Sequence, residues 1–166
     1  MQKREPLFEI RQSSIQGSGA FALRRIRKGR RIVEYKGKRI SNEEADELYA
    51  DPQKDPSHTV LFCVDEHTVI DAAREGNEAR LINHSCDPNC EAVLESGRIF
   101  IEAIRNIQLG VELSYDYNLK HEGRHTRELK EIHACRCGAR NCRGTILAPR
   151  PKRRKKGKRG RKTRAE

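Results

Sequence analysis

The sequence predicts a mainly β fold with few short helices. Three observations support this prediction. Short apolar runs recur at spacings near ten residues, turn-forming glycines separate them, and one segment carries a strong helix-start signal. A length of 166 residues favours one domain with one modest core over two domains.

The predicted strands are short runs rich in β-branched, aromatic and other apolar residues, bounded by turns. They cover residues 7–11, 20–23, 31–35, 59–64, 68–70, 91–94, 98–101 and 112–115. Glycines at 29, 37, 97 and 110 lie where the chain must turn between these runs. We find no internal repeat in the sequence.

The best-signalled helix begins after Ser41, where Ser41 and Glu44 form a predicted capping box. Apolar residues follow at helical spacing, and Pro52 ends the helix at the residue before it. A second short helix is predicted over residues 77–82. Residues 120–131 are charged and nearly free of apolar side chains, so we interpret them as an exposed linker or a weakly held helix.

The net charge of +11 is concentrated at one end of the chain. Residues 149–166 hold eleven Lys or Arg and one Glu, whereas the rest of the chain carries 24 basic and 23 acidic groups. Basicity is therefore predicted to be a property of this tail, which should be disordered when free. We expect residues 150–164 to bind nucleic acid through phosphates. A solvated tail without a partner, a nuclear address, or methylation of the tail by its own enzyme are the alternatives.

The sequence contains no apolar run approaching 18 residues, so we expect no membrane span. The first residues lack the apolar core of a secretion signal, and we therefore expect an intracellular protein. In such a protein a disulfide framework is disfavoured, and cysteines point to metal binding or burial.

Three cysteines follow a C-x-C-x4-C pattern: Cys135, Cys137 and Cys142. Three soft ligands within eight residues suit Zn²⁺, which takes four tetrahedral ligands. The residues alone leave the fourth ligand open between Cys86 and Cys90. Reduced thiols without a metal are the alternative, but the basic neighbours favour thiolates. The remaining cysteine, Cys63, lies in an apolar run and is predicted to be a buried strand residue.

Three further segments are denser in functional groups than ordinary turns. Residues 17–19 (Gly-Ser-Gly) precede another strand, which favours a simple β-turn over a nucleotide-binding loop. Tyr115 and Tyr117 alternate with an aspartate and so should face one side of a strand, where core packing is the common use of tyrosine. The pair Asn83-His84 would ordinarily be a capped turn, but it adjoins Cys86.

In this order, these segments resemble the SET-domain protein-lysine methyltransferases, over residues 7 to 147. The matching pieces are Gly17-Ser18-Gly19-Ala20-Phe21, Glu34-Tyr35-Lys36-Gly37, Asp71-Ala72 with Gly76-Asn77, the run from Ala79 to Asn89, Glu112-Leu113-Ser114-Tyr115-Asp116-Tyr117, and the cysteine cluster. The resemblance implies a fold of small curved β-sheets with a pseudoknot, in which the Asn-His-Ser-Cys and Tyr-Asp-Tyr segments pass one through the other.

The resemblance also implies a division of the chain. Residues 7–119 would form the SET catalytic domain and residues 120–134 a linker. Residues 135–148 would form a post-SET zinc segment, followed by the disordered basic tail, residues 149–166.

By the same resemblance, S-adenosylmethionine (SAM) would lie against Gly17, Ser18, Gly19, Phe21, Arg80, Asn83 and His84. Cys86 would complete a structural zinc site with Cys135, Cys137 and Cys142. Tyr117 would be the catalytic tyrosine, and Tyr35 and Tyr115 would form a narrow lysine channel with Phe62.

The implied activity is methylation of lysine side chains in a basic protein, histone-like or associated with nucleic acid. Tyr115 resembles the family members that stop at one or two methyl groups, because its hydroxyl can hold a water where a further methyl would lie. A catalytically inactive SET fold that binds nucleic acid is the alternative class. The expected location is the cytoplasm or nucleoid of a prokaryote, or the nucleus or chromatin of a eukaryote.

Overall fold

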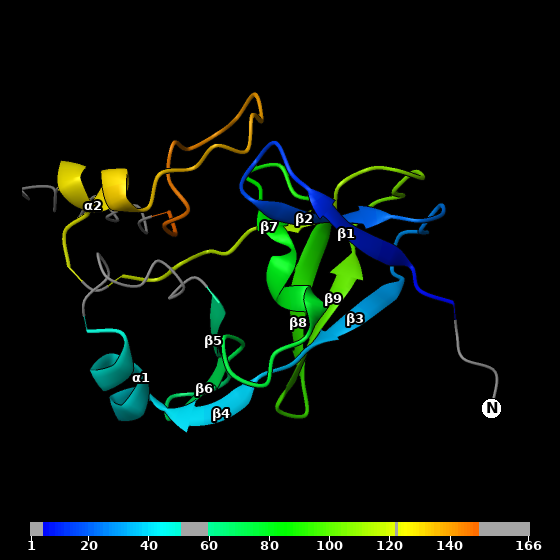
Figure 1. Cartoon of the computed structure of the whole chain (residues 1–166). Coiled ribbons are helices and arrows are strands. Elements are labelled where there is room, and N and C mark those ends of the chain that lie inside the picture. Colours follow the sequence, from blue (N-terminus) through cyan, green and yellow to red (C-terminus); the bar gives the residue numbers. More distant parts are fainter. Residues whose placement is uncertain (1–4, 51–59, 122, 150–166) are drawn as a thin grey trace, which may run out of the picture.

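The computed structural model describes residues 5–50, 60–121 and 123–149. These form ten short strands and few helical turns, which confirms the mainly β prediction (Figure 1). The strands are β1 (Phe8–Gln12), β2 (Ser18–Ala22), β3 (Arg31–Tyr35), β4 (Lys38–Ser41), β5 (Leu61–Cys63), β6 (Thr68–Asp71), β7 (Asn83–His84), β8 (Cys90–Glu95), β9 (Arg98–Ala103) and β10 (Ser114–Tyr115). The helices are α1 (Asn42–Leu48), the 3₁₀ helix η2 (Glu78–Leu81) and α2 (Arg127–Ile132).

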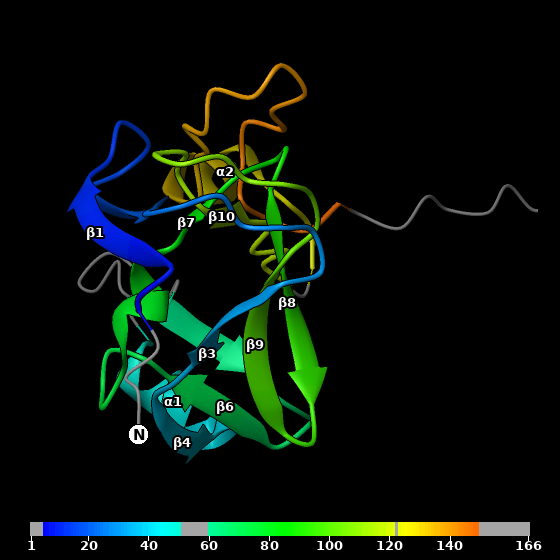
Figure 2. The same cartoon turned by 90° about the vertical axis from the view of Figure 1, so that its right-hand side faces the viewer.

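The strands form three small sheets. Strands β1 and β2 pair with each other, β4, β6 and β5 form a second sheet, and the largest has the order β3-β9-β8-β10-β7. Figure 2 shows the long β8–β9 hairpin at the side of the molecule, with β3 alongside it. The core lies where these sheets meet, around the buried side chains of β9 and their neighbours. It includes Ile26, Tyr35, Ile82, Ile99, Ile101, Ile107 and Leu113.

Strand β10 lies between β7 and β8 and runs parallel to both. Residues 85–89 connect those two outer strands, so the chain passes around β10 rather than pairing β7 with β8 directly. Asn89 holds the crossing point: its side chain donates to the Glu112 carbonyl at 2.7 Å and accepts from the Ser114 amide at 2.9 Å. This arrangement is the one expected from the resemblance.

The local predictions for helices are confirmed where the structure describes them. The Ser41 hydroxyl accepts from the Glu44 amide at 3.1 Å and caps α1. The segment predicted at 77–82 contains the 3₁₀ helix η2. Helix α2 overlaps the charged segment 120–131, extends to Ile132 and buries none of its residues. Pro52, the predicted end of α1, and residues 150–166 of the tail lie outside the described residues.

Every predicted strand has a counterpart, but β4 and β7 are missed. Strand β4 is polar in three of its four residues and buries only Ile40, and β7 is two residues long, so neither has a recognisable periodicity. The prediction that Cys63 is buried is wrong: its side chain is exposed, because β5 is an edge strand that covers little of the core. Among the described residues, no helix is long and apolar enough to cross a membrane.

Candidate active site

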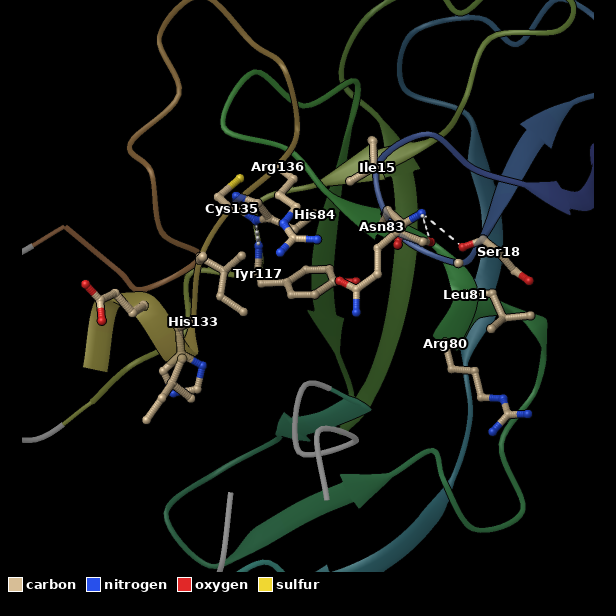
Figure 3. A pocket seen from close by; sticks show the side chains of 16 residues that line it. Ile15, Ser18, Arg80, Leu81, Asn83, His84, Tyr117, His133, Cys135 and Arg136 are labelled. Atoms are coloured by element: carbon tan, nitrogen blue, oxygen red, sulfur yellow. Dashed lines mark hydrogen bonds between the residues drawn. The ribbon is translucent and has the colours of Figure 1, made fainter. Parts of the chain in front are cut away.

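A cavity of about 590 Å³ opens between the glycine turn, η2 with β7, and the segment around α2 (Figure 3). Its volume is within the usual range for a small-molecule site. Its walls come from three distant parts of the chain. These are residues 15–18; Arg80, Leu81, Asn83 and His84 with Tyr117; and residues 131–136 with Ile146. The segment interpreted as a linker therefore contributes to this site, which no local signal in the sequence indicated.

The Asn83 side chain ties this cavity to the glycine turn. Its amide donates to the Ser18 carbonyl at 3.0 Å (Figure 3). The same amide donates to the Glu112 carboxylate at 2.8 Å. The same carboxylate accepts from the Ser13 hydroxyl at 2.7 Å. Because the Asn83 side chain is hydrogen-bonded to the glycine turn, the Asn83 backbone and the turn together form one wall of the cavity.

Glu112 explains why residue 19 is glycine. A Cβ atom at Gly19 would collide with the Glu112 carboxylate, so only glycine lets that side chain lie beneath the turn. Sequence analysis did not identify Glu112 as a site residue, because its partners Ser13 and Asn83 are 99 and 29 residues away.

His84 is a neutral imidazole between two parts of the site. The Tyr117 amide donates to its Nδ1 at 3.0 Å, so Nδ1 carries no proton, and Nε2 lies 3.3 Å from Cys86 Sγ. Burial lowers the pKa of His84 to about 4, although Asp116 opposes that shift. One ring thus connects the tyrosine segment to the cysteine cluster.

Four aromatic rings form a continuous row behind the cavity. Tyr35 and Phe62 have centroids 5.4 Å apart, Phe62 and Tyr115 are 6.3 Å apart, and Tyr115 and Tyr117 are 4.9 Å apart. The sequence predicted that Tyr115 and Tyr117 face one side. Their rings do meet, although Tyr117 lies beyond the end of β10.

Tyr117 belongs both to this row and to the cavity wall (Figure 3). Its hydroxyl donates to the Ile82 carbonyl at 2.9 Å, and the Tyr35 hydroxyl donates to the Val60 carbonyl at 2.6 Å. Burial raises the pKa of Tyr35, Tyr115 and Tyr117 well above the usual tyrosine value. All three hydroxyls therefore stay protonated near neutral pH.

The second predicted site is also assembled. The sulfur atoms of Cys86, Cys135, Cys137 and Cys142 all lie within 4.8 Å of one another. Cys86 Sγ is 3.8 Å from Cys135 Sγ and 4.0 Å from Cys142 Sγ. Four thiolates at zinc bonding distance in a tetrahedron would be about 3.8 Å apart, so the donor set and its spacing fit Zn²⁺.

Cys90, the other candidate for fourth ligand, is elsewhere. It is buried in the core, its thiol faces the Asn89 side chain at 3.3 Å, and burial raises its pKa to about 12. In the cluster, burial alone would raise the pKa of Cys137, but hydrogen bonds from the Cys86 and Ala139 amides lower it to about 6. Burial raises the pKa of the Cys86 and Cys135 thiols, so a bound cation would have to stabilise these two as thiolates.

Most of the residues expected to contact SAM line the cavity: Gly17, Ser18, Arg80, Asn83 and His84. Gly19 and Phe21 are not among its lining residues. Phe21 packs under the Arg11 guanidinium, 4.3 Å from its ring centroid, outside the cavity wall.

Comparison with known proteins identifies the family. Residues 17–118 match the SET domain. The "Histone-lysine N-methyltransferase, H3 lysine-4 specific" of Saccharomyces cerevisiae is 40% identical over 151 residues, which cover 88% of this chain and 14% of that protein. The proteins of that name in Eremothecium gossypii and Neurospora crassa are 39% and 37% identical over 151 residues, covering 87% and 88% of this chain. The chain thus spans only 14%, 15% and 11% of the three relatives.

Proposed function

The chain belongs to the SET-domain family, and we propose that it transfers methyl groups from SAM to a lysine side chain of a histone-like protein. The observation that supports this most is the position of Tyr117. It lies both in the wall of a cavity of suitable size and at the end of a row of four aromatic rings. Such a row can hold the stem of a lysine and bring its nitrogen to the cavity.

We propose that Gly17, Ser18, Arg80, Asn83 and His84 hold SAM, with Gly19 allowing the turn its close packing. The bound molecule supplies a methyl group on a sulfonium centre. The lysine must arrive as a neutral amine, and deprotonating a free lysine at pH 7 costs about 4–5 kcal/mol. A dry channel formed by Tyr35, Phe62, Tyr115 and Tyr117 disfavours the ammonium form and lowers that cost.

The protonated hydroxyl of Tyr117 is held by the Ile82 carbonyl at 2.9 Å. Fixed in this way, it can orient the amine without acting as a base. Tyr115 lies beside it, and we propose that its hydroxyl holds a water that limits the reaction to one or two methyl groups.

We propose that Cys86, Cys135, Cys137 and Cys142 bind a structural zinc ion. Four thiolates leave no open position, so the metal takes no part in transfer. The role of the ligands is to hold residues 131–136 against the cavity.

The proposed substrate class follows from the relatives, whose names specify histone H3. All three are fungal, which favours the nucleus and chromatin over the nucleoid. We also propose that the basic residues 150–164 bind nucleic acid. Deleting residues 149–166 should then weaken retention on DNA while sparing transfer to a peptide.

The proposal is tested by incubating the full chain with methyl-labelled SAM and, separately, histone octamers or a lysate of its own cells. Label in methyl-lysine is the expected result, and its mass spectrum names the protein and position. A histone H3 in which arginine replaces the lysine that the relatives' names specify tests whether this chain shares their specificity. A folded, zinc-loaded preparation that binds SAM but labels no lysine in either mixture contradicts the proposal and favours the inactive binding module.

A further inference from the structure

The turn between β2 and β3 carries the densest run of positive charge in the described chain. Residues 24–31 contain six Arg or Lys and no acidic residue. Arg24 pairs with Glu5, and Arg31 pairs with two glutamates. Among the described residues, the other four cations have no carboxylate partner: Arg25, Arg27, Lys28 and Arg30.

These four side chains are held on a rigid support. Ile26 is 1% exposed, and its backbone exchanges two hydrogen bonds of 2.8 Å with Ile107. Because neighbours of an inward side chain on an extended chain point outward, Arg25 and Arg27 share the solvent face. The Arg30 amide donates to the Arg27 carbonyl at 3.1 Å, so these two residues are the ends of one β-turn with Lys28 at its tip.

The fold contains a second copy of this turn. Residues 22–29 (Ala-Leu-Arg-Arg-Ile-Arg-Lys-Gly) align with residues 103–110 (Ala-Ile-Arg-Asn-Ile-Gln-Leu-Gly), a repeat that sequence analysis missed. Each follows a strand that ends in alanine, and the two lie side by side (Figure 1).

The two copies have matching geometry. Gly29 and Gly110 both have φ of +78°, and each donates its amide to the alanine of the other copy at 2.7 Å. Val111 donates to Gln108 as Arg30 donates to Arg27.

The second copy acts as an internal control. Where the first has Arg27 and Lys28, the second has Gln108 and Leu109, in a turn with the same glycine φ and an equivalent hydrogen bond. The turn therefore does not need cations to form. Mutual repulsion of the four positive side chains on the first turn opposes folding. We therefore infer that these side chains bind a negatively charged partner.

We propose that the β2–β3 turn is a second nucleic-acid contact, in which Arg25, Arg27, Lys28 and Arg30 bind the phosphate backbone of a duplex. Three of the four are arginines, whose planar guanidinium matches a phosphate with two hydrogen bonds. The turn lies at the opposite end of the molecule from α2 (Figure 1). A duplex held there leaves the cavity and the zinc segment uncovered. The body of the chain, predicted to be nearly neutral, thus contains a local basic surface.

The test is the salt dependence of binding of the full chain to a duplex DNA of arbitrary sequence. The turn variant carries Arg25→Gln, Arg27→Gln, Lys28→Gln and Arg30→Gln. Each phosphate contact contributes about 0.9 to the slope of log K against log salt, so the slope should fall by about 3–4.

A matched control removes the same charge from cations that face carboxylates: Arg11→Gln, Lys36→Gln, Lys38→Gln and Arg127→Gln. Its slope should fall by less than about 1. An equal fall in both variants, or none in the turn variant, overturns the proposal.

Two further measurements distinguish this proposal from the proposed methyl transfer and from binding of an acidic protein. Methyl transfer to a free peptide should proceed at the same rate in the turn variant and in the unaltered chain. DNA binding is measured without SAM or peptide, so the turn can be tested even if the chain proves to have no transferase activity. An acidic polypeptide such as polyglutamate should compete poorly with the duplex. If the unaltered chain binds polyglutamate more tightly than the duplex, and the turn variant loses that affinity for polyglutamate, the surface recognises an acidic protein and the nucleic-acid proposal is wrong.

Discussion

The Arg143 guanidinium donates two hydrogen bonds to the Asp116 carboxylate, at 2.7 and 2.8 Å. Arg143 directly follows the last cysteine of the cluster, and Asp116 lies between Tyr115 and Tyr117. Burial alone would raise the pKa of Asp116, but the bonds from Arg143 lower it overall. The pair thus joins the cysteine cluster to the tyrosine segment through two charge-assisted bonds.

Arg143→Lys should weaken this connection, because an ammonium cannot reproduce the two parallel bonds of the guanidinium. We expect a loss of about 1–2 kcal/mol in the free energy of unfolding and a lower kcat/KM. Thermal unfolding and steady-state kinetics measure both. Arg140→Lys is the matched control in the same segment, since Arg140 is exposed and should tolerate the change. Equal behaviour of the two variants would show that the pair does not position the tyrosines.

Tyr117→Phe should lower kcat by about 10²-fold or more, because it removes the hydroxyl that orients the amine while keeping the ring. The affinity for SAM, measured by calorimetry, should change by less than about threefold, since the fold of the cavity is kept. Tyr49→Phe removes a tyrosine hydroxyl outside the aromatic row and serves as the control. Full activity in the Tyr117 variant would exclude this residue as the orienting group.

Tyr115→Phe should change the product. The wild type is expected to stop at mono- or dimethyl-lysine, and the variant should add a further methyl because the space held by water becomes free. Mass spectrometry of a peptide after exhaustive reaction reads the distribution directly. Abundant trimethyl-lysine from the wild type, or an unchanged distribution in the variant, would contradict this role.

Metal removal should abolish transfer and loosen residues 131–136. The purified chain should contain one zinc per molecule by elemental analysis, and Cys86→Ser should lose it. Cys63→Ser is the control, because Cys63 is exposed and outside the cluster. Undiminished turnover in a verified metal-free sample would refute a structural role for the metal.

The rate should rise with pH. Below the pKa of the substrate lysine, the neutral amine increases about tenfold per pH unit, so kcat/KM should follow it between about pH 7 and 9. Tyrosine ionisation should not interrupt this rise, because burial raises the pKa of Tyr117 above its usual value. A descending limb near pH 8 that disappears in Tyr117→Phe would show instead that this tyrosine ionises in the working range.

Local patterns in the sequence were enough for most elements of the fold. The capping box at Ser41, the alternating strands and the three clustered cysteines involve residues within a few positions of one another. Their structure therefore depends on backbone propensity and ligand spacing, which can be read without knowing the fold. The family resemblance added the order of the segments and, with it, the expected chemistry.

Longer-range choices could not be read in this way. The residues alone left Cys86 and Cys90 as equal candidates for the fourth ligand, because they lie only four positions apart in the sequence. In the fold, Cys86 lies two residues after β7, and its sulfur lies beside those of the zinc segment. Cys90 is the first residue of β8, and its side chain is buried in the hydrophobic core. Glu112 was not identified for the same reason: Asn83 reaches it through the pairing of β7 with β10, and Ser13 reaches it through the pairing of β2 with residues 111–113.

The sequence by itself determined that this protein is mainly β, carries a C-x-C-x4-C metal signal and ends in a basic tail, because these depend on composition and short spacings. Only the tertiary structure decided that Arg143 joins the cysteine cluster to Asp116, and that two similar turns pack side by side, one of which carries four cations without a carboxylate partner. It also brought Cys86, the ligand implied by the resemblance, to the other three cysteines. Those relationships join residues far apart in the chain. They exist only once the hydrophobic core has closed around β9 and fixed which surfaces meet.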